Sequence, residues 1–154
     1  MTDEPIVVEQ VLDAPINKVW EALTDHTKMK SWYFNILDFQ AVPGFEFEFY
    51  GGREDRQYLH RCKVTAVEPC RKLSYSWKYE GYPGESFVSF ELLNEAGKTR
   101  VKVTHEGLGS FPQDNADLAK ENFREGWNYI IGTGLKNFVE QGPGENIQPK
   151  IPSK

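Results

Sequence analysis

NFREGWNYIIGTGLKNFVEQG, the stretch from Asn122 to Gly142, has the apolar spacing of a long amphipathic helix but carries glycines at 126, 132 and 134. Glycine inside a helix costs roughly 0.5–1 kcal/mol relative to alanine, so three of them need a reason. On a wheel of about 100° per residue, Gly134 lies near the middle of the apolar face and Gly132 points roughly the opposite way. The rest of that face is Phe123, Trp127, Ile130, Ile131, Leu135 and Phe138. We therefore predict a gap on the buried side of the helix, which either admits a close-packed strand or opens a cavity.

Before this helix, from about residue 33 to residue 106, apolar residues recur at period two. FEFEFYGG places Phe45, Phe47 and Phe49 on one side of the chain and acidic residues on the other, which is typical of a half-buried strand. Further strands are expected at Phe34–Val42, Tyr58–Val67, Leu73–Tyr79, Ser86–Leu93 and Thr99–His105. Short turns such as Glu68-Pro69 join consecutive strands, which indicates an antiparallel meander.

The N-terminal part predicts a strand at Ile6–Leu12 and a short helix at Pro15–Leu23. Asp25 is placed to be the N-cap of a second short helix that ends at about Trp32. The long helix is expected at about Asn115–Gln141, after a polar loop. The fold class is therefore α+β: an antiparallel sheet of six or seven strands with one long helix. One helix covers only one face of the sheet, and a strongly twisted sheet wrapped around that helix leaves space between the two. This space is suited to a small-molecule cavity.

The composition limits the classes of function. The length of 154 residues suits one domain, which we place at residues 1–142, with a flexible tail at 143–154. A net charge of −5 without a Lys/Arg cluster argues against nucleic-acid and anionic-membrane binding. No apolar run approaches the ~18 residues of a membrane span, and the acidic start MTDEPIVVEQ is unlike a signal peptide. We expect a cytoplasmic protein without a membrane span.

Cysteines and histidines give little sign of chemistry. Cys62 and Cys70 read as free thiols, and a redox pair would require them to meet across the turn at Glu68-Pro69. The three histidines lack metal-ligand spacing, so no metal and no cofactor are predicted. No Ser-His-Asp or Cys-His arrangement is visible, so no catalytic residue is assigned and an enzyme is not the leading expectation.

The high aromatic content, 14%, supplies the best candidate site residues. As a group the aromatic residues favour a cavity lining, although each one alone is more often packed core; Trp20 is expected in the core. The predicted ligand-binding residues are Trp32, Phe47, Phe49, His60, Tyr75, Trp77, Phe87, Trp127, Ile130 and Gly134. His60 either orients a ligand or is a hydrogen-bonded or surface histidine. His105 is expected at a rim or on the surface and His26 on the surface, while Glu46 and Glu48 face either a cavity wall or solvent.

Five stretches in order resemble one known family. They are VWEALTDHTKMKSWYF (Val19–Phe34), PGFEFEFYGG (Pro43–Gly52), VEPCRKLSYSW (Val67–Trp77), GKTRVKVTHEG (Gly97–Gly107) and GWNYIIGTGLKNFVEQG (Gly126–Gly142). Together they resemble the activator-of-Hsp90-ATPase homologue family of the START-like, or helix-grip, superfamily, also called SRPBCC. The resemblance implies a curved antiparallel sheet gripping a long C-terminal helix over a deep cavity.

The resemblance leaves several functions open, because one fold hosts many activities. The leading prediction is a binding domain for a small hydrophobic or amphipathic ligand. The alternative is a chaperone-associated domain whose partner is an Hsp90-type chaperone. The second alternative is an enzyme similar to polyketide cyclases and aromatases.

Overall fold

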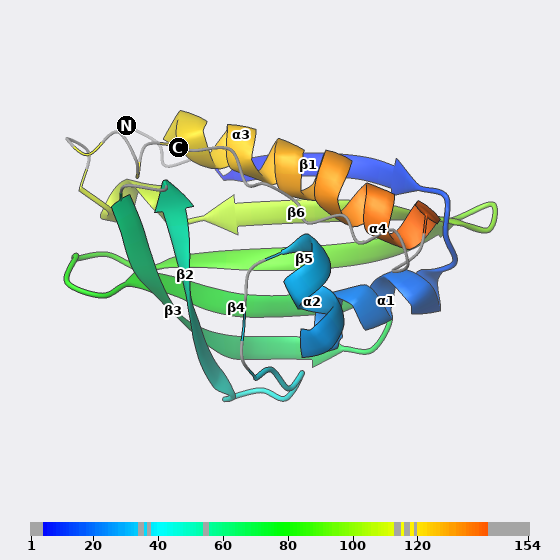
Figure 1. Ribbon diagram of the computed structural model, residues 1–154, viewed down its shortest axis with the longest axis horizontal. Helices are drawn as coiled ribbons and strands as arrows, with labels where there is room; N and C mark the ends of the chain where they lie inside the picture. Colours follow the sequence, from blue (N-terminus) through cyan, green and yellow to red (C-terminus); the bar gives the residue numbers. More distant parts are fainter. Residues whose placement is uncertain are drawn as a thin grey trace.

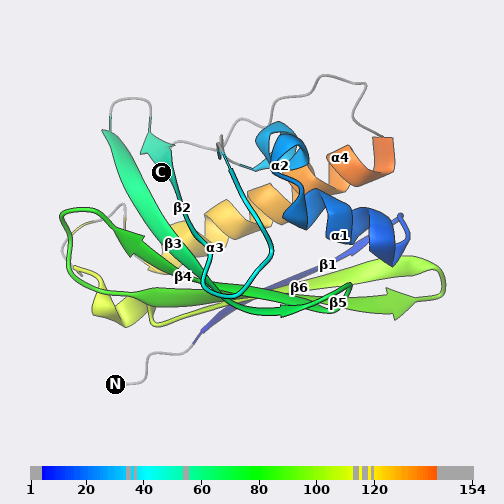
Figure 2. The same cartoon turned by 90° about the horizontal axis from the view of Figure 1, so that it is seen from below.

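The computed structural model describes residues 5–33, 36, 38–53, 56–112, 115, 118 and 120–141. One six-stranded sheet forms the base of the molecule, and all the helices of the described part except a short 3-10 turn near its end lie over one of its faces (Figures 1 and 2). Figure 2 shows β2 and β3 bending up beside the helical layer, so that the sheet curves around α3. This is the predicted α+β architecture, a curved antiparallel sheet with a long C-terminal helix.

Every neighbouring pair of strands is antiparallel, in the order β1-β6-β5-β4-β3-β2. The strands are β1 (Ile6–Leu12), β2 (Glu46–Arg53), β3 (Arg56–Glu68), β4 (Lys72–Tyr79), β5 (Ser86–Glu95) and β6 (Lys98–Glu106). Ala96 and Gly97 alone connect β5 to β6, with φ of 54° and 87°. Two residues with positive φ are the signature of a type I′ hairpin, which fixes the register of these two strands.

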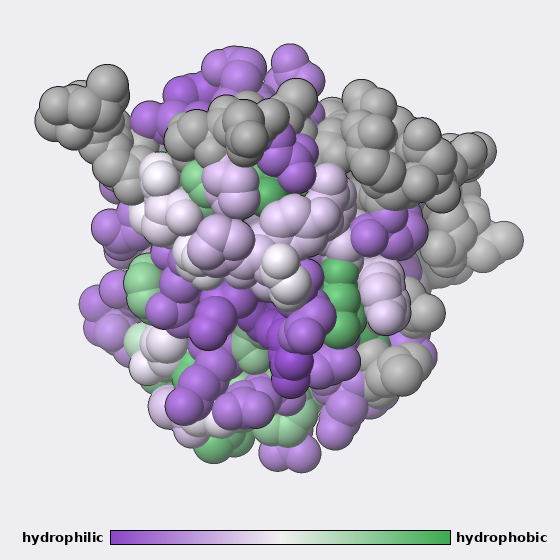
Figure 3. All heavy atoms as spheres, turned by 90° about the vertical axis from the view of Figure 1, so that its left-hand side faces the viewer, coloured by the Kyte–Doolittle hydropathy of each residue, from purple (hydrophilic) through white to green (hydrophobic). Residues whose placement is uncertain are grey.

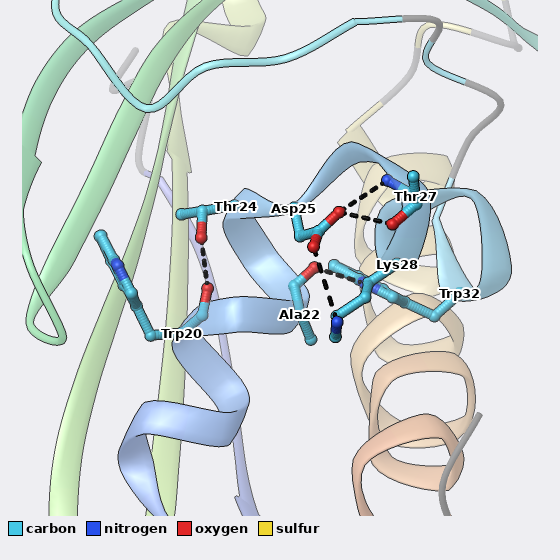
Figure 4. Close-up of polar contacts among 7 residues, drawn as sticks. All are labelled: Trp20, Ala22, Thr24, Asp25, Thr27, Lys28 and Trp32. Carbon is cyan, nitrogen blue, oxygen red and sulfur yellow. Dashed lines mark hydrogen bonds and ion pairs between the residues drawn. The ribbon is translucent and has the colours of Figure 1, made fainter.

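Two short helices, α1 (Ile16–Thr24) and α2 (His26–Trp32), follow β1 as predicted. Asp25 is the N-cap of α2: its carboxylate accepts hydrogen bonds from the Thr27 amide at 2.9 Å and the Thr27 hydroxyl at 2.6 Å (Figure 4). These bonds lower the pKa of the Asp25 carboxyl. Trp32 ties the two helices together, because its indole N–H donates to the Ala22 carbonyl of α1 at 2.8 Å.

The C-terminal helix consists of α3 (Lys120–Tyr129), a π-helical segment η3 (Ile130–Leu135) and α4 (Lys136–Gln141). The two glycines in its second half, Gly132 and Gly134, both lie in the π segment. A π turn holds about one extra residue, so it rotates everything after it by about 100° relative to a straight α-helix. This explains why Val139 is buried at 1% exposure while Phe138, which the straight wheel placed on the buried face, is only partly buried.

Gly132 also differs from the prediction that it points away from the sheet. A Cβ at this position would lie 3.1 Å from Nε2 of Gln10, a residue of β1. The helix therefore approaches β1 closely at Gly132, and a larger residue would press on Gln10. Gly134 is buried in the same segment, as its place on the apolar face predicted.

One predicted strand and one predicted helix start were wrong. In the segment Phe34–Val42, the described residues 36 and 38–42 form no strand, and residues 34, 35 and 37 lie outside the described part. Phe39 instead packs edge-on against Phe47, with 5.0 Å between ring centroids, and is 4% exposed, so it fills part of the core from outside any strand. The long helix begins at Lys120, not at about Asn115, which is outside any helix. The predicted tail at 143–154 lies outside the described residues.

Candidate functional site

The inner face of the sheet, where the C-terminal helix crosses it, is the candidate site. Alternate residues of the strands face the helix, so the aromatic residues at every second position of β2, β3 and β4 meet there. Of the predicted ligand-binding residues, only Phe87 is exposed. The buried ones are Trp32, Phe47, Phe49, His60, Tyr75, Trp77, Trp127, Ile130 and Gly134.

Aromatic rings join the helix to the sheet. The Trp127 ring of α3 lies edge-on to Phe90, with 5.6 Å between ring centroids, and tilted against Trp77 at 5.8 Å. It also stacks with Tyr33, at the end of α2, at 6.2 Å. Tyr33 in turn lies 6.0 Å from Phe49 of β2. One side chain, Trp127, therefore contacts both the central strands and the α2 end of the interior.

His105 of β6 is completely buried and forms a chain of hydrogen bonds with its neighbours. The Trp127 indole N–H, which can only donate, donates to Nδ1 of His105 at 3.0 Å. Nδ1 is therefore unprotonated, so Nε2 carries the hydrogen and donates to the Ser86 hydroxyl at 2.7 Å. The Ser86 hydroxyl then donates to the Trp77 carbonyl at 3.4 Å. Burial, with a smaller contribution from the charge of His60, lowers the pKa of His105 to about 3.

His60 of β3 is the second buried imidazole, at 5% exposure. Its ring stacks on Phe49 at 4.5 Å and meets Tyr79 at 4.7 Å and Trp77 at 5.0 Å. Its Nδ1 donates to the Tyr58 carbonyl at 2.9 Å, because a carbonyl can only accept. Burial lowers the pKa of His60 to about 4, against the opposing effect of its backbone hydrogen bonds. His60 therefore faces the interior and is hydrogen bonded there. Its imidazole is neutral at neutral pH.

The remaining polar atoms of the interior are hydroxyls and a thiol. The hydroxyls of Tyr33 and Tyr75 are hydrogen bonded to each other at 2.8 Å, and the Trp77 indole donates to the Tyr79 hydroxyl at 2.9 Å. Burial raises the pKa of all three tyrosines and of the Cys62 thiol. At neutral pH the interior thus presents uncharged hydrogen-bonding groups among aromatic rings.

Two sequence predictions about burial were wrong: Phe87 was predicted to line the interior, and His105 was predicted at a rim or on the surface. Phe87 is 42% exposed on the outer face, while His105, expected at a rim, is 0% exposed. The alternation of buried and exposed residues along β5 and β6 could have placed both side chains correctly. Val88 and Phe90 face inward and leave Phe87 outside, whereas Val103 and His105 share the inward phase of β6. Tyr33, Tyr79 and Ser86 also belong to the interior, and sequence reasoning did not select them.

The other candidates lie outside this interior. Glu46 and Glu48 are exposed on the outer face of the sheet, so they do not line the interior beneath the helix. Trp20 is only partly buried against the core, and His26 is partly exposed. Both cysteines are free: Cys62 is buried in β3, and Cys70 lies in the β3–β4 turn. Within the described ranges, no group of three or more His, Cys, Asp or Glu is arranged to hold a metal ion, and no helix is long and apolar enough to cross a membrane.

Comparisons with known proteins agree with this geometry. The model of the family described as "Activator of Hsp90 ATPase homolog 1-like protein" matches residues 13–140. DynU16, a protein in the dynemicin biosynthetic locus, is similar over 90% of this chain and 48% of its own, with a TM-score of 0.73 and 24% identity. This chain therefore spans about half the length of DynU16.

Two further solved structures are similar over most of this chain. CalU16 from Micromonospora echinospora has a TM-score of 0.69 and 26% identity, covering 90% of this chain and 76% of its own. BH1534 from Bacillus halodurans has a TM-score of 0.71 and 27% identity, covering 90% of this chain and 99% of its own. No curated protein matches the sequence.

Proposed function

Because the chain belongs to the activator of Hsp90 ATPase homolog 1-like family, whose fold is a sheet curved around a C-terminal helix, we propose that it binds a small hydrophobic or amphipathic ligand between the two. The observation that carries the proposal is the set of uncharged polar groups buried among aromatic rings on the inner face. Pockets that take small molecules have this composition, mostly aromatic with a few placed hydrogen-bonding groups.

The chemistry of the interior defines the class of ligand. Ring faces from Phe49, Trp77 and Trp127 favour a flat, largely apolar molecule. The hydroxyls of Tyr33 and Tyr75 would hydrogen bond to a polar atom of that molecule. A charged ligand group would be disfavoured, because every titratable group around it is neutral at pH 7 and buried.

Tyr33 is the side chain that we expect to move when a ligand enters. It caps the end of α2, outside regular secondary structure, and its ring covers Trp127 and Phe49. A single rotation of its side chain would exchange these ring contacts and the bond to Tyr75 for contacts with a ligand. The replacement Tyr33→Phe keeps the ring and removes the bond, so it should change the affinity for a polar ligand more than for a hydrocarbon.

Native mass spectrometry of the protein purified from its own host is the direct test, because a bound molecule appears as added mass. In parallel, a hydrophobic fluorescent dye tests whether the interior takes up an apolar molecule. Gly134→Leu adds a side chain on the buried face of the π segment and should weaken dye binding. Leu93→Ala, which removes an exposed apolar side chain of β5 that lines neither the interior nor the hollow on the outer face of the sheet, is the control and should leave dye binding unchanged. Equal dye binding by wild type and Gly134→Leu would contradict a site at this part of the helix.

Association with an Hsp90-type chaperone remains the rival proposal, since the family is named for that activity. Figure 3 shows one end of the molecule, where the hydrophobic residues drawn in colour lie in separate groups between hydrophilic ones. The rival is tested by adding the protein to an Hsp90-type chaperone and measuring ATP hydrolysis. Stimulation that survives Gly134→Leu would favour the chaperone role over ligand binding. A cyclase-like activity is a third proposal, and turnover of a ligand found by mass spectrometry would support it.

A further inference from the structure

The outer face of the sheet, opposite α3, carries a hollow of about 630 Å³ over β2, β3 and β4. Its floor includes four side chains that form a block across two strands. In the strand register, Lys63 of β3 is opposite Ser76 of β4, and Arg61 is opposite Lys78. All four lie out of phase with Cys62, Tyr75 and Trp77, which face the interior. The block is therefore separate from the ligand site proposed above.

Ser76 is the unusual member of the block, because a serine on an outer face is ordinarily well solvated. Here it is only 5% exposed. Its oxygen accepts a hydrogen bond from the Lys63 amide at 3.1 Å, and its hydroxyl hydrogen has no acceptor among the described residues. Burying a donor without an acceptor costs desolvation free energy. A ligand that accepts a hydrogen bond from this hydroxyl would offset that cost.

The three cationic side chains of the block differ in whether they form ion pairs with carboxylates. Arg61 is held by Glu80 at 2.6 Å and by Glu48 at 3.7 Å, and these carboxylates raise its pKa. Lys63 and Lys78, which are exposed, form no ion pair with any residue that the structure describes. Two unpaired lysines thus lie on the same face as Ser76, Lys63 directly across from it on β3 and Lys78 two residues further along β4. Their arrangement suits an oxyanion, which accepts from several donors at once.

One aromatic side chain lies beside the block, next to the hollow and outside its lining. Phe87 of β5 is opposite Ser76 in the register, and it is 42% exposed. Four carboxylates also line the hollow: Glu48 and Glu80, which pair with Arg61, Glu46, which is opposite Lys63 in the register of β2 and β3, and Glu85. A large polyanion would be repelled by this acidic rim, whereas a small ligand with one anionic group would reach the centre. The ring of Phe87 would then cover the apolar part of that ligand.

We propose that this outer hollow binds a small amphipathic anion, with its anionic group beside Lys63 and Lys78 and accepting from the Ser76 hydroxyl, and with its apolar part against Phe87. Carboxylates and phosphate monoesters share the required chemistry. Both are compatible with the donors present, so the test includes one of each.

Benzoate and phenyl phosphate serve as probes, with benzamide as the uncharged analogue of benzoate. Each is titrated into the ¹⁵N-labelled protein while amide chemical shifts are followed. We expect saturable shifts at residues 61–63, 76–78 and 87 with an anionic probe and none with benzamide. The probe that binds more tightly shows whether the site prefers a carboxylate or a phosphate monoester. Raising the salt concentration should weaken binding, because the lysines are exposed.

The variants isolate the contribution of each group. Ser76→Ala should weaken binding roughly tenfold, as expected for a hydrogen bond to a charged group. Lys63→Gln should weaken it a few-fold, and it remains informative if Ser76→Ala folds poorly, because Lys63 is exposed. Lys28→Gln, which removes a lysine of α2, is the control and should bind like wild type.

Three results would overturn the proposal. The first is benzamide binding as tightly as benzoate, and the second is affinity that Ser76→Ala and Lys63→Gln both leave unchanged. The third is a set of shifts centred on the Trp127 indole, which would assign the probe to the interior. Because Ser76→Ala should not alter dye binding inside the domain, failure of the outer site and failure of the proposed function are distinguishable.

Discussion

Lowering the pH to about 5 should destabilise the protein well before its carboxylates are protonated, because two imidazoles are buried in the neutral form. His60 and His105 have folded-state pKa values of about 4 and about 3, against an ordinary value of 6.5. Between these values and 6.5 the unfolded chain binds protons that the folded protein does not. The stabilising contribution of the neutral imidazoles is therefore complete above pH 6.5 and is lost as the pH falls below it.

The magnitude follows from the distance between the chosen pH and 6.5. At about pH 5 the unfolded imidazole is protonated and both folded imidazoles remain largely neutral. Each histidine then lowers the free energy of unfolding by ~1.36 kcal/mol for each of the roughly 1.5 pH units below 6.5, or about 2 kcal/mol. The two together give a loss of about 4 kcal/mol, a large part of the roughly 5–15 kcal/mol by which domains are stable.

Denaturant unfolding at about pH 7.5 and about pH 5 measures this loss directly. The replacement His60→Phe keeps an aromatic ring against Phe49 and Tyr79 while removing one titrating group. It should lose only about 2 kcal/mol over the same interval. His26→Gln is the matched control, since both buried imidazoles are retained, and it should lose as much as wild type.

Two outcomes would refute the reasoning. One is a wild-type loss below about 1 kcal/mol, which would mean that at least one imidazole can be protonated in the folded state. The other is an undiminished pH dependence in His60→Phe, which would assign the effect to other groups. The lowered pKa of the Asp25, Glu95 and Glu140 carboxyls acts only at more acidic pH, so it does not disturb the comparison.

Three further predictions concern the scaffold, and chemical or thermal unfolding measures each of them. Asp25→Ala should cost about 1 kcal/mol through loss of the α2 cap, whereas Asp25→Asn should cost clearly less; equal losses would argue against a capping role. Gly84→Ala should cost roughly 1–3 kcal/mol, because φ is +108° and a Cβ would lie 2.5 Å from the Ser110 carbonyl oxygen; Gly81→Ala, with φ of +85° and open space around it, should cost less. Trp32→Phe should cost about 1–3 kcal/mol, since it leaves a buried carbonyl of α1 without its indole donor, and a neutral effect would contradict the importance of that bond.

The strands were predictable because their signal is local. Phe45, Phe47 and Phe49 alternate with acidic residues, and this alternation alone predicts a strand with one buried face. The same reasoning failed at Phe34–Val42, where Phe39 supplies an apolar residue that the core needs but no strand forms in the described part. Local apolarity predicts burial at such a position, but backbone pairing depends on whether a neighbouring strand is within reach.

The interior was predictable in part. Trp77, Trp127 and His60 were selected by residue type and phase, and they do face one another across the interior. Phe87 and His105 were misplaced although alternation within their own strands held the answer. A shift of one residue moves a side chain to the other face, so residue type is a weaker guide than phase.

The sequence by itself determined the order of helices and strands, the α2 cap and the aromatic inner face, since these depend on residues that are neighbours in the chain. Only the tertiary structure decided the hydrogen-bond chain from Trp127 through His105 to Ser86, whose three members come from α3, β6 and β5. Only the tertiary structure also showed the π segment, in which Gly132 lies close to Gln10. After this segment the buried side chain is Val139 and not Phe138. Both features depend on how the helix is positioned on a sheet built from segments distant in sequence, and such long-range packing leaves no periodic signal within the helix itself.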